Sequence, residues 1–260
     1  WEPQERIRED MALAVEAARD ADAVVICTGF TRESESEGFD RSFALGNETE
    51  ELIRQAADAN PRAVVVLHAG GNVDVRNWVD AVQGVLHVWY PGQDGGRATS
   101  EILFGHVNPS GKLPATFEND VADRSSFECY HDEDGDKRVQ LADGVFTGYR
   151  HFDRHEIAPR YPFGYGLSYT TFEYENLHLD AAELNAGDSL QVSFEIRNTG
   201  QREGAEAAQI YVADRESTHP RPVKELKGFA KVHLEPGEKK AVTVKLDPTA
   251  FRYFDPDRAH

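Results

Sequence analysis

The chain has few cysteines, a shortage of positive charge and no long apolar run. Its two cysteines in 260 residues, Cys27 and Cys129, favour neither a disulfide framework nor a cysteine-based metal site. Lys and Arg number 28 against 46 Asp and Glu, and the net charge of −18 disfavours nucleic acid and anionic membranes as partners. No segment reaches the roughly 20 apolar residues that a membrane-spanning helix needs. These absences favour a globular protein with another kind of partner.

The first part of the chain alternates apolar strands with amphipathic helices. We expect strands at 21–30, 62–70, 84–90 and 112–117, and helices at 48–60, 72–82 and 95–105. This alternation predicts a mostly parallel α/β/α sandwich, covered on both faces, over residues 1–120. Asn47 is the expected N-cap of the first of these helices, and Glu50 would complete a capping box.

The second part of the chain has a different hydrophobic pattern. Residues 121–168 form a polar, irregular connection between domains; its acidic run DEDGD lacks the ligand spacing of a calcium loop, so no metal site is expected. Residues 169–260 show strands of period two between turn signals, which predicts an immunoglobulin- or fibronectin III-like β-sandwich. Five or six strands are visible where such sandwiches have about seven. We therefore expect its last strands to come from elsewhere in a longer polypeptide.

An acidic loop directly follows the first buried strand. The sequence ESESEGFDR places Glu33, Glu35 and Glu37 at alternate positions in this loop. Ligands of open α/β sheets bind outside the carboxyl ends of the strands. Hydrolysis of a glycosidic bond needs two carboxyl groups, one of which such a loop could supply. The residues alone allow two interpretations of this segment: a solvated surface loop, or a loop that supplies a catalytic carboxylate.

Other motifs favour structural roles. His68 and His87 lie within apolar strands and are expected to be buried and hydrogen-bonded. Cys27, in the first strand, is expected to act as a small hydrophobic residue. The glycine-rich turns at 68–74 and 91–97 match no phosphate-binding pattern, and no GxSxG motif of a serine hydrolase is present.

Four segments of the chain resemble a known family. They are ESEGFDRSFALGNETEELI (35–53), HVWYPGQDGGRATSEILFGHVNPSGKLPATF (87–117), VFTGYRHFDRHEIAPRYPFGYGLSYTTFEY (145–174) and RPVKELKGFAKVHLEPGEKKAVTVKL (221–246). In this order they are similar to the C-terminal portion of glycoside hydrolase family 3, the β-glucosidase family. The resemblance extends over nearly the whole chain.

The resemblance implies a retaining exo-β-glycosidase, without cofactor or metal, that acts on a β-glucoside or cello-oligosaccharide. In such enzymes an N-terminal barrel carries the nucleophilic Asp, and the α/β sandwich domain lends a general acid/base from the SEG motif. That residue corresponds to Glu37 here, with Glu35 as the reserve candidate. Asp40 and Arg41 would brace the loop, and Phe39 would form part of the wall of the sugar pocket. No barrel lies in these 260 residues, so we expect this segment alone to be inactive.

Alternatives remain at this stage. The specificity could be that of a β-xylosidase or exo-glucanase, and the acid/base could sit on the barrel, as in related N-acetylglucosaminidases; the SEG motif argues against that. The chain could also be a non-catalytic carbohydrate-binding or assembly module. Four aromatic residues would then stack on sugars rather than pack in the core: Trp78, Trp89, Tyr161 and Tyr165. The sequence leaves homo-oligomerisation and the cellular compartment open.

Overall fold

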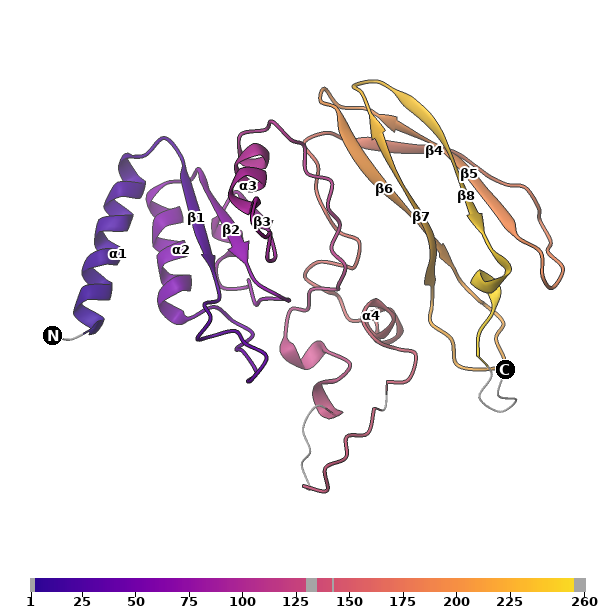
Figure 1. Ribbon diagram of the computed structural model, residues 1–260, viewed down its shortest axis with the longest axis horizontal. Helices are drawn as coiled ribbons and strands as arrows, with labels where there is room; N and C mark the ends of the chain where they lie inside the picture. The colour runs from indigo at the N-terminus through magenta and orange to yellow at the C-terminus, as the bar shows by residue number, and fades with distance from the viewer. Residues whose placement is uncertain (1–2, 130–134, 142, 255–260) are drawn as a thin grey trace. The chain divides into compact units, whose positions relative to one another are not determined.

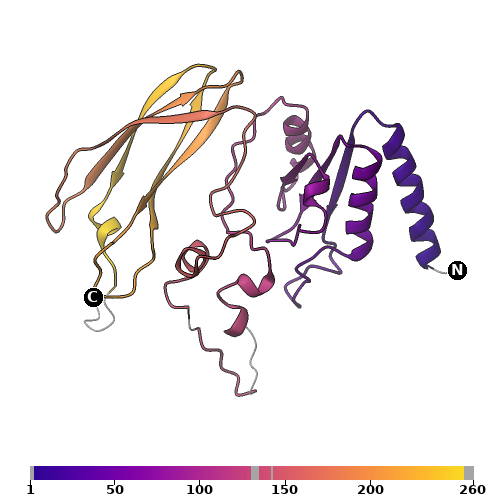
Figure 2. The same cartoon turned by 180° about the vertical axis from the view of Figure 1, so that it is seen from behind.

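The chain folds into two compact units (Figures 1 and 2). The computed structural model describes residues 3–129, 135–141 and 143–254. Unit 1 comprises residues 1–100 and 117–121, and unit 2 comprises residues 101–116 and 122–260. Most of the acidic run DEDGD lies outside the described residues, as does the C-terminal DPDRAH. The domain boundaries expected at 120 and 168 stay predictions.

A parallel three-stranded sheet forms the centre of unit 1. Its strands, in the order β1-β2-β3, are β1 (Val24–Gly29), β2 (Ala63–His68) and β3 (Gly84–His87). All three arise where the sequence has apolar runs rich in β-branched residues. The middle strand β2 is the most buried, and Val65 and Val66 are fully inaccessible. This confirms the expected parallel α/β class.

The helices of unit 1 are α1 (Pro3–Asp20), α2 (Asn47–Ala59) and α3 (Gly95–Leu103), the last of which crosses the boundary of the unit. Helix α2 packs on β1 and β2, and α1 packs on α2 (Figure 1). Covering of the sheet on both faces was expected, but β1 departs from it: Val25 is 49% exposed. Cys27 is also exposed, so its expected burial is wrong.

Three local expectations are also wrong. Helix α2 has Gly46 as its N-cap without a side-chain cap, and the Glu50 carboxylate accepts a hydrogen bond from Asn77 Nδ2 at 2.9 Å, so no capping box forms. The helix expected at 72–82 is reduced to the short 3₁₀ turn η1 (Val79–Ala81). Residues 112–117 form no strand.

The irregular segment that follows residue 120 contains short helices. They are η2 (Val121–Asp123), η3 (Phe127–Cys129) and α4 (Tyr149–His155). Where a strand was expected, Leu113 instead exchanges backbone hydrogen bonds of 2.8 Å with Gly164 and Tyr165. Pro114 interrupts any longer ladder, because it has no amide hydrogen to donate.

Two antiparallel sheets make up the rest of unit 2. One has the order β4-β5-β8 and the other pairs β6 with β7. Their strands are β4 (Phe172–Leu179), β5 (Leu190–Asn198), β6 (Gly204–Val212), β7 (Glu225–Leu234) and β8 (Lys239–Leu246), followed by the 3₁₀ turn η4 (Pro248–Phe251). A core that includes Ile196, Leu234 and Leu246 joins the two sheets. The all-β expectation for this part is confirmed.

The inner face of the three-stranded sheet is partly uncovered. Tyr174 pairs with buried Ile196, and Leu179 pairs with buried Val192, so both side chains face the core. They are nevertheless 51% and 47% exposed. A cavity of about 710 Å³ lined by β4, β5 and β6 lies there. Among the described residues β6 pairs with β7 alone, so one of its edges has no partner strand.

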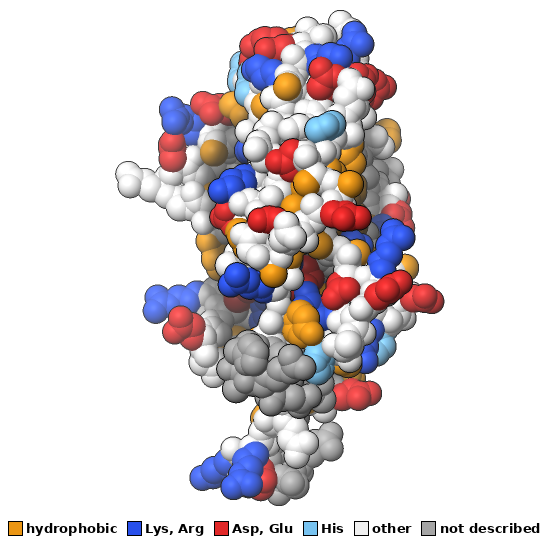
Figure 3. Space-filling model, turned by 90° about the vertical axis from the view of Figure 1, so that its right-hand side faces the viewer, with side chains coloured by type: hydrophobic (Ala, Val, Ile, Leu, Met, Phe, Trp, Pro, Cys, Tyr) orange, Lys and Arg blue, Asp and Glu red, His pale blue; other side chains and the backbone are white. Residues whose placement is uncertain are grey.

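The molecular surface mixes charge with apolar groups. On the face that Figure 3 shows, apolar side chains are scattered between acidic and basic ones. Across the described residues, no helix combines the length and the apolar character that crossing a membrane requires.

Candidate active site

The acidic loop leaves the carboxyl end of β1 and ends in a tight turn. Ser36 and Phe39 form an isolated antiparallel bridge, which puts Glu37 and Gly38 at the tip. Glu37 is exposed and takes part in none of the hydrogen bonds or ion pairs resolved for the described chain. Phe39 beside it is 48% exposed. The tip therefore offers a carboxyl group and an aromatic ring to whatever approaches it.

Glu35, two residues before the tip, is held in place. Its Oε1 accepts a hydrogen bond from Arg41 Nε at 2.7 Å, and the backbone N–H of Gly70 lies 3.3 Å from both carboxylate oxygens. The hydroxyl of Tyr90 donates to Oε2. Burial alone would raise the pKa of Glu35, but the hydrogen bonds from Tyr90, Gly70 and Arg41, with the charge of Arg41, lower it below the usual value. Glu35 is therefore an ionised anchor.

Arg41 closes the loop at its other end. Besides Glu35, its guanidinium donates to the carbonyl oxygen of Asn72 at 2.6 Å and to that of Ser42 at 3.0 Å. It also lies over the ring of Phe30, 4.4 Å from the centroid. The Arg41 and Glu35 side chains are 15% and 17% exposed, so this ion pair is shielded more than a surface pair.

The loops after β2 and β3 complete this arrangement. Trp89 has a φ of 53°, a left-handed conformation that bulky residues rarely adopt. The next residue, Tyr90, lies against Gly70, where a Cβ atom would come within 2.9 Å of the Tyr90 ring and 3.2 Å of Glu35 Oε1. Gly70 therefore allows the close approach of the loops that follow all three strands.

His87 lies near this arrangement in an apolar environment. Its ring contacts Trp89 and Phe117 edge-on, with centroids 4.2 and 5.5 Å away. Burial, with smaller contributions from the charges of Arg41 and His68, lowers the pKa of His87 to about 4. Neither ring nitrogen has a hydrogen-bond partner among the described residues, so the expected hydrogen bonding of this histidine is wrong.

The sequence-predicted residues therefore separate into two groups. Glu37 and Phe39 lie at the tip, and Asp40 is exposed between the tip and Arg41. Glu35 and Arg41 lie together at the base. Sequence reasoning missed their partners in the loops after β2 and β3, which are Gly70, Asn72 and Tyr90. The available signal was positional, because the carboxyl ends of parallel strands meet at one edge of a sheet.

The aromatic residues considered for sugar stacking are largely engaged with the protein. Trp78 is 1% exposed, and Trp89 packs against His87. Tyr161 and Tyr165 lie 5.0 Å apart, each within reach of the other's ring. Packing thus accounts for Trp78 and Trp89, whereas Tyr165 is 37% exposed.

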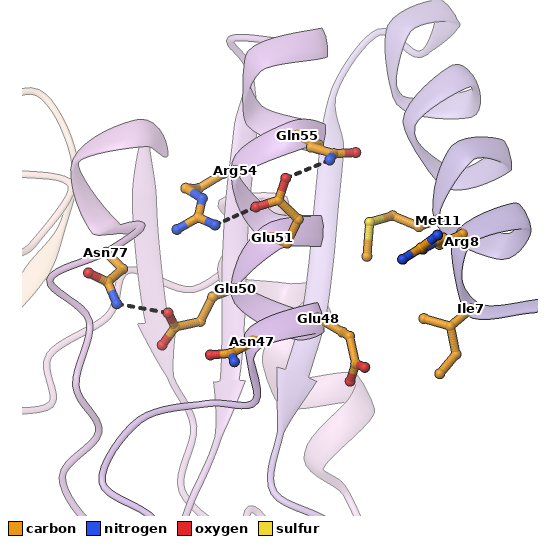
Figure 4. A pocket seen from close by; sticks show the side chains of 10 residues that line it. All are labelled: Ile7, Arg8, Met11, Asn47, Glu48, Glu50, Glu51, Arg54, Gln55 and Asn77. Carbon is orange, nitrogen blue, oxygen red and sulfur yellow. Dashed lines mark hydrogen bonds and ion pairs between the residues drawn. The ribbon is translucent and has the colours of Figure 1, made fainter. Parts of the chain in front are cut away.

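Two further features of the described chain lie apart from the loop residues. A cavity of about 630 Å³ between α1 and α2 is lined by acidic and basic side chains of both helices and by Asn77 (Figure 4). Within it, Arg54 forms an ion pair with Glu51, and Asn77 donates a hydrogen bond to Glu50. On the sandwich, the exposed side chains of Glu203, His233 and Glu235 could reach a common ion, but exposed acidic groups often cluster in this way without binding a metal.

Comparison with known proteins gives a consistent picture. Residues 4–169 match the family model of the glycosyl hydrolase family 3 C-terminal domain, and residues 206–260 match that of a fibronectin type III-like domain. The thermostable beta-glucosidase B of Acetivibrio thermocellus is 42% identical over 93% of this chain and 32% of its own length. An exo-alpha-(1->6)-L-arabinopyranosidase of Bifidobacterium breve is 40% identical, over 93% of this chain and 31% of its own.

A solved structure shares the fold. The crystal structure of a family 3 beta-glucosidase from Bifidobacterium adolescentis superposes with a TM-score of 0.91 at 39% identity, covering 97% of this chain and 37% of that one. The chain thus spans about a third of the length of the relatives that it matches.

Proposed function

The chain belongs to glycosyl hydrolase family 3, and from this premise we propose that it supplies the general acid/base of a retaining β-glucosidase. Glu37 is the proposed acid/base, and a barrel domain outside these 260 residues would carry the nucleophilic Asp. The observation that carries the proposal is the position of Glu37, exposed at the tip of a loop whose base is anchored.

In the proposed mechanism Glu37 transfers one proton in each of the two chemical steps. The barrel carboxylate attacks the anomeric carbon, the bond to the leaving oxygen breaks, and protonated Glu37 gives its proton to that oxygen. Glu37, now ionised, then takes a proton from water as the water attacks the glycosyl ester and releases the barrel carboxylate. The configuration is retained, and we expect about 5–5.5 Å between the two carboxyl groups in the working enzyme.

The contacts of the two candidate carboxylates favour Glu37 over Glu35. Glu35 accepts hydrogen bonds from Arg41, Gly70 and Tyr90, which hold it ionised and leave it no proton to give. Glu37 is exposed and close to a flanking ring, Phe39. A general acid must reach the leaving oxygen within hydrogen-bond distance, which a tip residue can do and an anchored one cannot.

The neighbouring residues have supporting roles in this proposal. Arg41 braces the loop through Glu35 and the carbonyl oxygen of Asn72. We propose that Asp40 helps to brace the turn from the other side and that Phe39 forms part of the wall of the sugar pocket. The half-exposed ring of Phe39 suits such a role, since sugars pack well on aromatic faces.

We also propose the class of substrate. Most relatives of similar identity are named beta-glucosidases, which favours a terminal β-glucosyl residue, as in a β-glucoside or cello-oligosaccharide. The arabinopyranosidase, which is 40% identical over 93% of this chain, has another sugar in its name. We therefore propose that most of the contacts that determine sugar specificity are made by the barrel rather than by this chain.

The test is a leaving-group series with Glu37→Gln in the full-length polypeptide. For a substrate with a poor leaving group, such as phenyl β-glucoside or cellobiose, kcat/KM should fall by about 10²–10⁴-fold, because protonation of the leaving oxygen is lost. For 2,4-dinitrophenyl β-glucoside, which leaves without protonation, the first step should be nearly unaffected. Equal losses of kcat/KM on both kinds of substrate would contradict the assignment of Glu37 as the general acid/base.

A further inference from the structure

We propose that Glu35, Arg41 and Tyr90 form a positioning clamp, which fixes the tip that carries Glu37. The inference rests on the proposed role of Glu37 and extends it to residues that hold rather than react. Tyr90 and Glu35 are positioning residues in this proposal, because they act through the loop that carries Glu37 and take no part in the proton transfer itself.

The clamp joins the loops that follow all three parallel strands. Glu35 lies after β1, Gly70 follows β2, and Tyr90 follows β3; the carboxylate of Glu35 takes a hydrogen bond from each of the other two. Arg41 adds a second connection, from the end of the acidic loop to the carbonyl oxygen of Asn72 after β2. One carboxylate thus joins its own loop to two chain segments that are 35 and 55 residues from it in sequence.

Backbone strain indicates that the position of Tyr90 is specific. Trp89 adopts a φ of 53°, a conformation that is unfavourable for a residue with a bulky side chain. Such a conformation persists where the surroundings over-determine it, and here Tyr90 contacts Gly70 and Glu35 immediately after it. The absence of a side chain at Gly70 is what lets the tyrosine ring come so close.

The tip needs such a support. Its own contacts are the Ser36–Phe39 bridge and a 3.4 Å hydrogen bond from the Gly38 amide to Ser36 Oγ. A misplacement of about 1 Å can cost an enzyme on the order of 10²-fold in rate. The clamp lies two residues before and four residues after Glu37, close enough to fix both ends of the turn.

The experiment compares Tyr90→Phe and Glu35→Gln with Glu33→Gln in the full-length polypeptide. Tyr90→Phe removes one hydroxyl and keeps the ring beside Gly70. Glu33 lies on the same loop but is exposed, so Glu33→Gln is the matched control. Two readouts are taken, the amide hydrogen exchange of residues 34–42 and kcat/KM across the leaving-group series.

Both clamp variants should speed exchange of residues 34–42 by about 10-fold or more while the amides of β2 keep their protection. They should lower kcat/KM for phenyl β-glucoside by about 10–100-fold and for 2,4-dinitrophenyl β-glucoside by less than about 3-fold. The control should change neither readout. A variant that merely destabilised the fold would lose activity on both substrates alike.

Unchanged exchange in both clamp variants would overturn the proposal, as would equal losses on the two substrates. The outcome is separable from that for Glu37 itself. If Glu37→Gln shows the leaving-group dependence and the clamp variants do not, the clamp is refuted and the acid/base assignment stands. If Glu37→Gln lacks that dependence, the proposed function falls, and the kinetic part of the clamp proposal falls with it.

Discussion

At the scale of single residues, His87 shows how burial sets a charge state. Its imidazole lies between Trp89 and Phe117, without a hydrogen-bond partner among the described residues. Burial lowers its pKa to about 4, so the ring is neutral at physiological pH. A neutral ring avoids placing a positive charge beside the guanidinium of Arg41.

This environment predicts an acid-sensitive stability. The pKa of His87 is about 4 in the folded chain and 6.5 for an unperturbed imidazole, so the unfolded chain binds more protons between these values. The stability contributed by neutral His87 is therefore complete above pH 6.5 and is lost as the pH falls toward 4. We expect a loss of about 1–2 kcal/mol, less than the full linkage value because the ring is partly solvated.

The substitution His87→Phe isolates this effect. It keeps the aromatic contacts and removes both unpaired nitrogens, so the thermal midpoint at pH 7 should be equal or higher. Differential scanning calorimetry between pH 4 and 7 should show a smaller decline of the unit 1 transition in the variant than in the parent chain. An identical decline in both would contradict the assignment of the acid sensitivity to His87.

At the scale of elements, a single asparagine joins the ends of two helices. Asn60 is the C-cap of α2 and is 4% exposed. Its Nδ2 donates to the carbonyl oxygens of Ala18 and Ala21 at 2.9 and 2.7 Å, and its Oδ1 accepts from the amide of Arg62 at 2.9 Å. The side chain thereby satisfies backbone groups at the end of α1 and at the start of the next strand.

The substitution Asn60→Ala should lower the free energy of unfolding of unit 1 by about 2–4 kcal/mol, because a buried side chain loses three hydrogen bonds, one buried and two partly buried. The control is Asn47→Ala at the first position of α2, which makes no cap and is exposed. It should cost less than about 0.5 kcal/mol. Urea unfolding of both variants makes the comparison, and comparable losses would contradict this account of α2.

The sequence was informative about elements where the pattern was simple. Apolar β-branched runs predicted β1, β2 and β3, and period-two alternation predicted the five strands of the sandwich. The pattern failed at 72–82, where the amide and guanidinium of Arg76 bond the Asp74 carboxylate. A local side-chain bond of this kind competes with helix formation. Val73, Val75 and Trp78 are buried although they lie outside a helix. Apolar spacing alone cannot distinguish such a buried irregular segment from an amphipathic helix.

The candidate site was predictable only in part. The family resemblance pointed to Glu37 and to its loop neighbours, whose roles stay predictions. The contact of Glu35 with Tyr90 joins residues 55 positions apart, and it depends on the left-handed turn at Trp89. No periodicity or local motif encodes such a contact, because it arises from the register of the parallel strands.

At the scale of the whole molecule, the sandwich leaves part of its core face open. Tyr174 and Leu179 face inward yet are about half exposed, and β6 has an edge that no described strand pairs. An open edge beside an apolar face favours the addition of another strand. This arrangement fits our expectation that further strands of a longer polypeptide complete the sandwich.

The 260-residue chain by itself should therefore bind a hydrophobic dye such as ANS or self-associate, whereas the full-length polypeptide should do neither to the same degree. Fluorescence titration at equal molar concentrations, with sedimentation to follow association, makes the comparison. Equal dye binding by the two proteins would indicate that the open face is a permanent surface of the native protein.

The most direct test of the central claim is azide rescue of Glu37→Ala in the full-length polypeptide, read by NMR of the product. Without a carboxylate at the tip, azide can replace the activated water and attack the glycosyl-enzyme from the same face. The account predicts a rate on 2,4-dinitrophenyl β-glucoside that rises with azide and a β-configured glucosyl azide as product. An unchanged rate with glucose as the product would contradict the role of Glu37.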